Sequence, residues 1–538
     1  MPLAAVLASL LTGVGIHAQD PLRDLQAEAI ESMDEKRERL FSFGWQGLNG
    51  IFSTHRNHSN RLIPLVTFGP FSDLSALSGP NAAYRSEDRL AEIYGRTPPS
   101  TQTAGHEALD QTDIHRLIRS AVDQGCKRVI VMLLDGGDWH IQSAASVVAY
   151  DTYDPEGLGA GLPWFEYSPP GGVPGRPVRD EGFVVTSPLR GRVAPGYDIA
   201  RGGRFPWSEQ NAEYLAGDYY RDLQGRRTAN RTVHAVVDSA ASATAIFSGR
   251  KTTNGKINQG PDGERFVPLG VELQQRGFTV ATVTDVPFDH ASPACVYASE
   301  ESRNSYQSIG RQMLGGGEEP GVDIVLGYGF GFGEDGQKYL SQPDLDLTRR
   351  FYNVVTPNFD AVPGEFALGS NLLHNAALRT AAERSGARHG PGRLFGFFGR
   401  AGLDHAPYRT ADNRFDPVPG VNGRGAPGGP EEYSELDLEI QPTLREMTSA
   451  ATKILHATPD APFFLFVEAG LVDWAQHANN LDNAVGEVRS AAATFEHLAD
   501  WVTDHGWWDE TLFIVTSDHG HLLQVDFEGL REAVHGER

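Results

Sequence analysis

The chain has 538 residues, of which 46 are basic and 70 are acidic, so its formal net charge at pH 7 is −24. This balance makes nucleic acids and anionic membranes poor partners, and it also disfavours polyanionic polymers as ligands. The length would allow three or four domains, and no internal repeat divides the sequence.

The first residues have the pattern of an export signal. Residues 3–16 are apolar and are followed by Ala-Gln-Asp at 18–20, which predicts a signal peptide over residues 1–18, although no Lys or Arg precedes the apolar run. A run of about 14 apolar residues is too short for a stable membrane span. We therefore expect a periplasmic or secreted protein without a stable membrane span.

Three regions lie outside the main pattern of strands. Residues 19–120 predict a helical and extended lead, which begins with a charged amphipathic helix over residues 21–39. Residues 152–230 are rich in Gly and Pro and predict a surface insertion or a lid. A second insertion is predicted near residues 330–440, with a long surface excursion over residues 404–432.

Two apolar runs are followed by residues that can act in catalysis or bind a ligand. Residues 128–134 predict a buried strand that ends at Asp135. Residues 232–237 predict another strand, and the small residues after it favour a helix capped by Asp238 or Ser239. The hydroxyl of Ser239 would then lie beside free backbone N–H groups that suit an anion. An isolated Asp-Ser pair is more often a plain helix cap. The prediction of a functional site here therefore depends on the other strand ends.

Three further apolar runs predict buried strands with metal-binding or acid–base residues at their carboxyl ends. They are residues 278–284 before Asp289-His290-Ala291-Ser292-Pro293, residues 463–467 before Glu468, and residues 511–516 before Asp518-His519. Ligands bind at this edge of open α/β sheets because the loops converge there. We therefore expect one large α/β domain, with a large central, mostly parallel β-sheet flanked by helices and with surface insertions.

The spacing after the strand over residues 463–467 indicates a metal site. Asp473 and His477 are four residues apart, so on a helix they share one face and can bind one ion. Mixed carboxylate and imidazole ligands suit zinc, whereas oxygen ligands such as Glu468 suit magnesium. Such a pair alone is more often structural. Together with Asp518-His519 it favours a site with several metals.

These segments resemble the alkaline phosphatase family, in particular its bacterial branch. The likeness runs over roughly residues 128–521 and rests on Asp-Ser-Ala-Ala-Ser-Ala-Thr-Ala at 238–245, followed by Ser-Gly-Arg-Lys-Thr-Thr-Asn-Gly at 248–255. It implies a catalytic domain over residues 121–538 that hydrolyses small phosphate monoesters with two Zn²⁺ ions and one Mg²⁺ ion. It also implies a homodimer, because the family is commonly dimeric.

The resemblance implies a role for each site residue. Ser239 would be the nucleophile that becomes phosphorylated, and Arg303, eleven positions after Ser292, would hold the phosphate. The implied metal ligands are Asp135, which bridges the second zinc and the magnesium; Asp518 and His519 at the second zinc; Asp473 and His477 at the first zinc; and Ser292 and Glu468 at the magnesium. His290 would tune the magnesium site from outside its ligands. Trp474 follows Asp473 as in some bacterial members, although a tryptophan beside a site more often only packs against it.

One departure from the family concerns the first zinc. The family takes a third ligand from a His-Thr-Gly-type segment well downstream of the Asp-His pair, and no such segment follows His519. His521 stands where the family usually has a histidine that is not a ligand, and His535 is a poor substitute. We expect either a weakened first zinc site or a sequence cut short at its C-terminal end.

Two alternatives stay open at this point. A phosphodiesterase of the same superfamily usually has a Thr nucleophile and lacks the arginine, so Ser239 and Arg303 disfavour it. A non-catalytic protein that binds metal or phosphate is favoured only by the missing histidine. The two cysteines, Cys126 and Cys295, lie outside the Cys-x-Pro-x-Arg pattern of the sulfatases, which share this general fold, and the sequence does not decide whether they pair.

Overall fold

The structure is a computed structural model. It describes residues 62–94, 109–153, 161–171, 178–186, 237–329, 350–356, 374–385, 393–399, 403–416, 433–458, 460–521, 523–525 and 527–536, together with residues 22, 25–26, 41–43, 58–59, 189. The predicted signal peptide, most of the predicted helix over 21–39 and the predicted strand over 232–236 lie outside the described residues.

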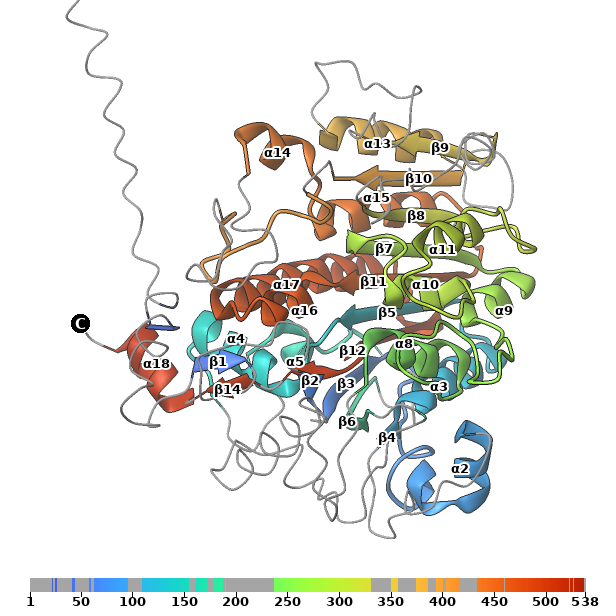
Figure 1. Ribbon diagram of the computed structural model, residues 1–538, viewed down its shortest axis with the longest axis horizontal. Coiled ribbons are helices and arrows are strands. Elements are labelled where there is room, and N and C mark those ends of the chain that lie inside the picture. Colours follow the sequence, from blue (N-terminus) through green and yellow to red (C-terminus); the bar gives the residue numbers. More distant parts are fainter. Residues whose placement is uncertain are drawn as a thin grey trace, which may run out of the picture.

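A ten-stranded sheet forms the centre of the described structure (Figure 1). In spatial order its strands are β4 (Leu109–Asp110), β6 (Arg179–Val185), β3 (Ile63–Phe68), β12 (Thr511–Ser517), β5 (Arg128–Leu134), β11 (Phe463–Ala469), β7 (Thr279–Pro287), β8 (Ile324–Tyr328), β10 (Arg393–Phe398) and β9 (Tyr352–Val355). Strands β12 to β9 in this order are all parallel, and β3 alone runs against the other nine. The predicted α/β fold with a large, mostly parallel sheet is confirmed.

Both faces of the sheet are buried under helices, and its central strands contribute apolar side chains to both faces. In β5, Ile130, Met132 and Leu134 belong to the core on one face, whereas Val129 and Val131 belong to the core on the other. This period-2 alternation is what a pleated strand buried on both faces requires.

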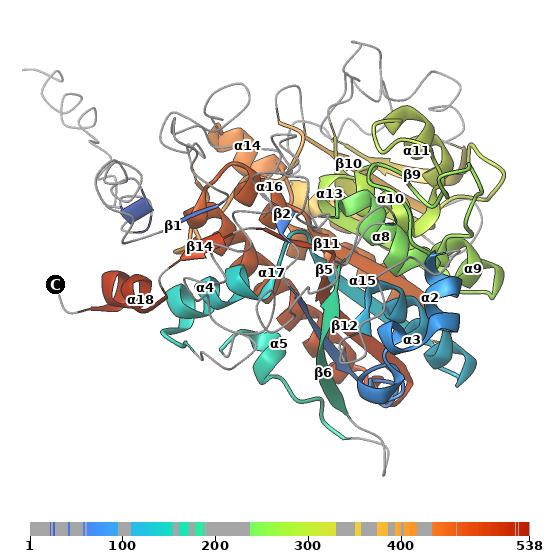
Figure 2. The same ribbon diagram turned by 60° about the horizontal axis from the view of Figure 1, so that its bottom comes forward.

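The helices divide between the two cores (Figure 2). One core is covered by α4 (Trp139–Tyr150), α5 (Pro163–Glu166), α13 (His374–Arg384), α15 (Leu444–His456), α16 (Leu471–His477), α17 (Leu481–Asp504) and α18 (Phe527–His535). The other is covered by α3 (Gln111–Asp123), α8 (Ser239–Ser248), α9 (Leu269–Gln275), α10 (Ala291–Tyr297) and α11 (Tyr306–Met313). Helices α2 (Glu87–Tyr94) and α14 (Glu435–Ile440) and the 3₁₀ turns η2 (Gly79–Asn81), η3 (Ala83–Arg85) and η4 (Trp508–Glu510) complete the described helical elements.

Two short antiparallel pairs lie outside the main sheet. Strand β1 (Phe41–Phe43) pairs with β14 (Leu523–Val525), and β2 (His58–Ser59) pairs with β13 (Gly520–His521). Both pairs join the N-terminal part of the chain to the segment that follows β12. The second pair lies at the candidate site.

Four of the predicted strands are present as β5, β7, β11 and β12. Strands β3 and β4 and helix α3 come from residues 19–120 and belong to the main sheet and its cover. Likewise β6 comes from the predicted insertion over 152–230, and β9 and β10 come from that near 330–440. These strands are at or near the edges of the sheet. Strand β6 is only partly buried, and its sequence lacks the continuous apolar run that is typical of a central strand.

Cys126 and Cys295 are both buried and do not form a disulfide. The thiol of Cys126 donates to the carbonyl of Arg128 at 3.3 Å, and that of Cys295 donates to the carbonyl of Ala240 at 3.4 Å. Among the helices that the structure describes, none combines the length and the apolar character needed to cross a bilayer.

Candidate active site

The carboxyl ends of β5, β11 and β12 lie at one level at the edge of the sheet. In these parallel strands the last residue of β5 is paired with the last residue of β11 and with that of β12. Asp135 and Asp518 follow β5 and β12 directly, and the N–H of Gly136 donates to Asp518 Oδ1 at 3.0 Å. Gly136 has φ +66°, and a Cβ there would lie 2.6 Å from Cδ2 of His521. Only glycine therefore allows the chain to turn this close to the site.

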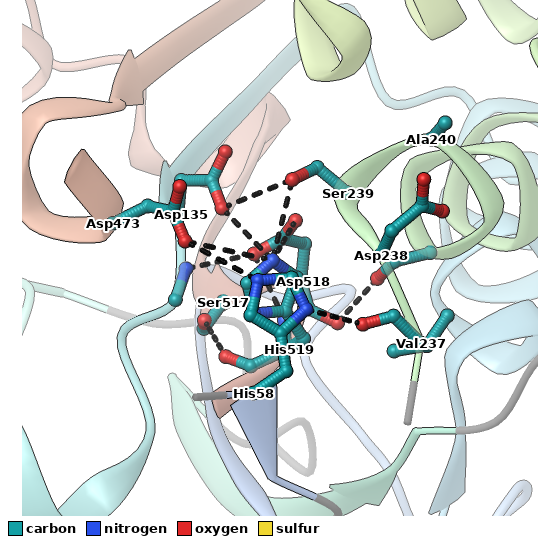
Figure 3. A network of polar contacts seen from close by, with 12 residues as sticks. His58, Asp135, Val237, Asp238, Ser239, Ala240, Asp473, Ser517, Asp518 and His519 are labelled. Carbon is teal, nitrogen blue, oxygen red and sulfur yellow. Dashed lines mark hydrogen bonds and ion pairs between the residues drawn. The ribbon is translucent and has the colours of Figure 1, made fainter. Parts of the chain in front are cut away.

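Ser239 points its hydroxyl at the residues of this edge. It is the first residue of α8, and Asp238 caps the helix by accepting from the N–H of Ala241 at 2.9 Å. Ser239 Oγ lies 3.4 Å from Asp135 Oδ1 and 3.2 Å from Nε2 of His519, as Figure 3 shows. The buried hydroxyl therefore stands between the positive end of a helix and a cluster of ionisable groups.

The carboxylates at this edge repel one another. Within the part of the chain that the structure describes, Oδ2 of Asp135 and Oδ2 of Asp518 accept no hydrogen bond. Burial, and then the neighbouring carboxylates, raise the pKa of Asp135 and of Asp518 well above the usual range. Burial also raises the pKa of Glu468 to about 8, although the hydroxyl of Thr284 donates to it at 2.5 Å and Ser292 lies beside it. A bound cation would remove this repulsion.

Histidines surround Asp473 beside these carboxylates. His477, one helical turn further along α16, places Nε2 3.4 Å from Asp473 Oδ2. His521 Nε2 contacts Asp473 Oδ1 at 2.5 Å. His58 Nε2 lies 3.2 Å from His477 Nε2 and 3.8 Å from Asp473 Oδ1. We call His58, Asp473, His477 and His521 the histidine group, and Ser239, Asp135, Glu468, Asp518 and His519 the strand-end group.

The charge states of the histidine group suit a metal. Burial would raise the pKa of Asp473, but His477 and His521 outweigh it and hold the pKa well below its usual value. Burial, and then the neighbouring histidines, lower the pKa of His58 well below its usual value, and burial lowers the pKa of His521 to about 3. An ionised carboxylate among neutral imidazoles is the ligand set that zinc prefers.

The spacing of the donors also fits metal ions. Four ligands about 2.0–2.1 Å from a tetrahedral zinc stand roughly 3.3–3.4 Å apart. His519 Nε2 lies 3.2 Å from Asp135 Oδ1 and 3.5 Å from Asp518 Oδ2, close to that separation. Three sets of donor atoms fall within 4.8 Å of one another: His58, Asp473, His519 and His521; Asp135, Asp518 and His519; and Asp135, His290 and Glu468.

Comparison with known proteins relates this chain to phosphatases. The sequence model of the alkaline phosphatase family matches residues 208–322 and 391–535. The chain is therefore similar to the alkaline phosphatase family over these two stretches. The streptomycin-6-phosphate phosphatase of Streptomyces griseus is 28% identical over 361 residues, which cover 62% of this chain and 71% of the relative. Alkaline phosphatase 4 of Bacillus subtilis is 24% identical over 287 residues, which cover 53% of this chain and 49% of the relative.

Among solved structures, a cold-active alkaline phosphatase from Shewanella sp. has 20% sequence identity and a TM-score of 0.44, and the match covers 73% of this chain and 68% of that one. The chain thus spans about half the length of the Bacillus relative and about two thirds of the Shewanella protein.

In this chain, Arg303 lies near Ser239, the candidate nucleophile. Its Nη1 donates to the capping Asp238 at 3.3 Å, and its Nη2 donates to His290 Nε2 at 2.9 Å. Because a guanidinium only donates, His290 Nε2 is the acceptor. The ring of Trp474 meets the ring of His290 edge-on, with centroids 5.8 Å apart. All the residues singled out in the sequence for catalysis or metal binding therefore lie in one region, and their individual roles stay predictions.

His521 and His535, the two possible substitutes for the third ligand of the first zinc, lie in different parts of the structure. His535 lies on α18, where its Nε2 contacts the carbonyl of Val147 at 2.7 Å, outside both groups. His521 contacts Asp473 directly. His58 was not predicted from the sequence, because site residues were predicted at the carboxyl ends of strands, whereas His58 precedes β3.

A buried polar chain supports the loop that carries Asp518. Lys251 pairs with Asp110 at 2.9 Å and donates to Gln111 Oε1 at 3.2 Å. Gln111 in turn donates through Nε2 to the carbonyl of Asp518 at 2.5 Å. The Lys in the stretch after α8 is therefore a positioning residue for the strand-end group, and so is Gln111, which sequence reasoning missed.

Proposed function

We propose that this chain hydrolyses small phosphate monoesters through a phosphoserine at Ser239 and releases inorganic phosphate. The single observation that supports this most strongly is the place of the Ser239 hydroxyl. It is buried at the start of α8 and lies within 3.4 Å of both Asp135 and His519, which are also candidate metal ligands. The similarity to the alkaline phosphatase family supports the same class of reaction.

We further propose two Zn²⁺ ions and one Mg²⁺ ion as cofactors. His519, Asp518 and Asp135 would hold the second zinc, Asp473 and His477 the first, and Asp135, Ser292 and Glu468 the magnesium. When bound, such ions supply positive charge that favours ionisation of the serine hydroxyl and of water, and that balances the charge of a phosphoryl group.

The chain's own residues then make and break the bonds. Ser239 Oγ attacks phosphorus, the bond from phosphorus to the ester oxygen breaks, and the leaving alcohol ends with the serine proton. Water next attacks the phosphoserine, breaks its O–P bond, restores Ser239 and releases phosphate. Arg303, held by Asp238 and His290, keeps N–H donors for two non-bridging phosphate oxygens, a fork that lysine does not provide.

The substrate class follows from charge and from the relatives. A net charge of −24 disfavours polyanionic polymers, whereas a small monoester brings little charge to the surface. One relative is named for streptomycin-6-phosphate, which is a small phosphate ester. Export to the periplasm or the medium and a homodimeric state are further parts of this proposal.

Hydrolysis of p-nitrophenyl phosphate and of bis(p-nitrophenyl) phosphate, with zinc and magnesium added, tests the proposal. We expect turnover of the monoester, and a loss of at least about a thousandfold in kcat for Ser239→Ala, because a nucleophile is removed. Ser248→Ala is the matched control, since Ser248 lies at the other end of α8 and bonds to the carbonyl of Thr244. Preference for the bis-ester would move the assignment to the phosphodiesterases, and no turnover of either would favour the non-catalytic alternative.

A further inference from the structure

The histidine group contains a residue that the family pattern does not supply. In the family, the third protein ligand of the first zinc lies well downstream of the Asp-His pair, whereas His58 precedes every other residue of this site in the sequence.

The backbone of His58 is fixed against the segment that carries the strand-end group. Strand β2 pairs antiparallel with β13, so that His58 is opposite His521 and Ser59 is opposite Gly520. A few residues later, β3 pairs antiparallel with β12 in the main sheet. Strands β2 and β3 therefore both run against the segment that contains Asp518-His519-Gly520-His521, and β2 reaches the site with its first residue.

The ring of His58 is oriented by a backbone carbonyl. Its Nδ1 lies 2.9 Å from the carbonyl oxygen of Val237, the residue before Asp238 (Figure 3). A carbonyl only accepts, so Nδ1 carries the proton and Nε2 keeps its lone pair. The ring also stacks on that of His519, with centroids 3.9 Å apart. A second bond that fixes the tautomer in this way is the usual support of a metal-binding histidine.

The free lone pair of His58 points at the other two ligands of the first zinc. The three side chains are mutually close: His58 Nε2 to His477 Nε2 is 3.2 Å, His477 Nε2 to Asp473 Oδ2 is 3.4 Å, and His58 Nε2 to the other oxygen of Asp473, Oδ1, is 3.8 Å. The first two separations match the roughly 3.3–3.4 Å expected between ligands of a tetrahedral zinc, and the third is somewhat longer. His521 is less suited, because its Nε2 already contacts Asp473 Oδ1 at 2.5 Å.

We propose that His58 is the third protein ligand of the first metal, together with Asp473 and His477, and that His521 is a positioning residue that holds Asp473. This inference rests on the metal site of the proposed function. It makes the N-terminal segment part of the metal centre rather than a lead in front of it.

Metal content is the test, measured apart from activity. The full-length chain and its His58→Ala variant are loaded with zinc, dialysed and analysed by mass spectrometry, and their zinc affinity is measured by competition with a chelator. We expect His58→Ala to lose one zinc equivalent, or to bind it at least about a hundredfold more weakly. His535→Ala is the matched control, because His535 lies outside the site, and it should keep the full zinc content.

A second variant covers the case in which His58→Ala fails to fold. His58→Cys keeps a zinc ligand at the position, and with Co²⁺ in place of zinc it should show a thiolate-to-cobalt charge-transfer band in the near ultraviolet. The unmodified chain should lack that band, because Cys126 and Cys295 lie buried in the core clusters. His535→Cys should lack it as well.

The outcomes separate this inference from the proposed function. If His58→Ala keeps zinc with unchanged affinity, or folded His58→Cys shows no band with Co²⁺, the inference is wrong even when the chain hydrolyses monoesters. If the variants behave as expected but no monoester is hydrolysed, the ligand assignment stands and the proposed activity fails. A native chain that binds no zinc would overturn both.

Discussion

The strand-end group and the histidine group meet in one site, but the chain builds them in different ways. Asp135, Glu468 and Asp518 lie at the carboxyl ends of parallel neighbouring strands, so the sheet alone sets their spacing. His58 instead comes from a two-residue antiparallel pair, and Asp473 and His477 come from a seven-residue helix. The first group therefore depends on the core of the sheet, and the second depends on how peripheral segments pack.

This difference has an electrostatic side. The strand-end group holds buried carboxylates whose pKa values are raised by burial and by one another. The histidine group holds a carboxylate, Asp473, whose pKa is held low by the histidines around it. Without cations the first group stores repulsion, whereas the second is largely compensated by its own members. Removal of metal should therefore disturb the strand-end group more.

The largest effect should come from Asp518→Asn in the strand-end group. The change removes a charged candidate ligand of the second metal but keeps the shape of the side chain, so the fold should persist. We expect kcat/KM for p-nitrophenyl phosphate to fall by about a thousandfold, since several kcal/mol of transition-state stabilisation would be lost. Asp509→Asn, on the exposed turn η4, is the control and should keep full activity. Comparable activity of the two variants would contradict a metal role for Asp518.

An intermediate effect is expected from Glu468, and it concerns stability rather than rate. Burial raises the pKa of Glu468 to about 8, so the folded metal-free protein binds a proton there that the unfolded chain releases above about pH 4.5. Its contribution to stability is thus present below about pH 4.5 and is lost as the pH rises towards 8. We expect the metal-free protein to lose stability between these values, with Glu468 accounting for a loss on the order of a few kcal/mol.

Urea unfolding at several pH values in EDTA measures this slope. Glu468→Gln cannot ionise, so it should show a shallower slope than the native chain, and added Mg²⁺ should flatten the slope of the native chain alone. Glu496→Gln, which changes an exposed carboxylate on α17, should leave the slope unchanged. Equal slopes for the native chain and Glu468→Gln would show that this carboxylate does not carry the strain we assign to the strand-end group.

The same contrast explains how much of the site the sequence could predict. A buried parallel strand is a continuous apolar run, and the residue after it lies at the ligand-binding edge, so Asp135 and Asp518 could be found without coordinates. His58 could not be found in this way, because β3 is antiparallel and its amino end, not its carboxyl end, meets that edge. His58 lies five residues before Ile63-Pro64-Leu65, so a pattern that includes metal-binding residues before apolar runs, as well as after them, would indicate it.

The smallest effect should come from Trp474, which follows Asp473 on α16 but contacts the site only through other side chains. Its ring meets the rings of His290 and His405 edge-on, with centroids 5.8 and 5.4 Å apart, and His290 in turn accepts from Arg303. Trp474→Ala should loosen this support, so that inorganic phosphate inhibits about threefold more weakly, which is less than 1 kcal/mol, while kcat stays nearly unchanged.

Trp474→Phe keeps an aromatic edge against His290 and should restore phosphate binding, which a simple loss of stability would not explain. The phosphate inhibition constant and kcat are therefore measured for both variants at the same metal concentrations. A fall of tenfold or more in kcat for Trp474→Ala would mean that the residue next to Asp473 acts on the metal ligands themselves. Because Asp473 is one residue away on the same short helix, that result would mean that Trp474 supports the histidine group rather than the contact between His290 and Arg303.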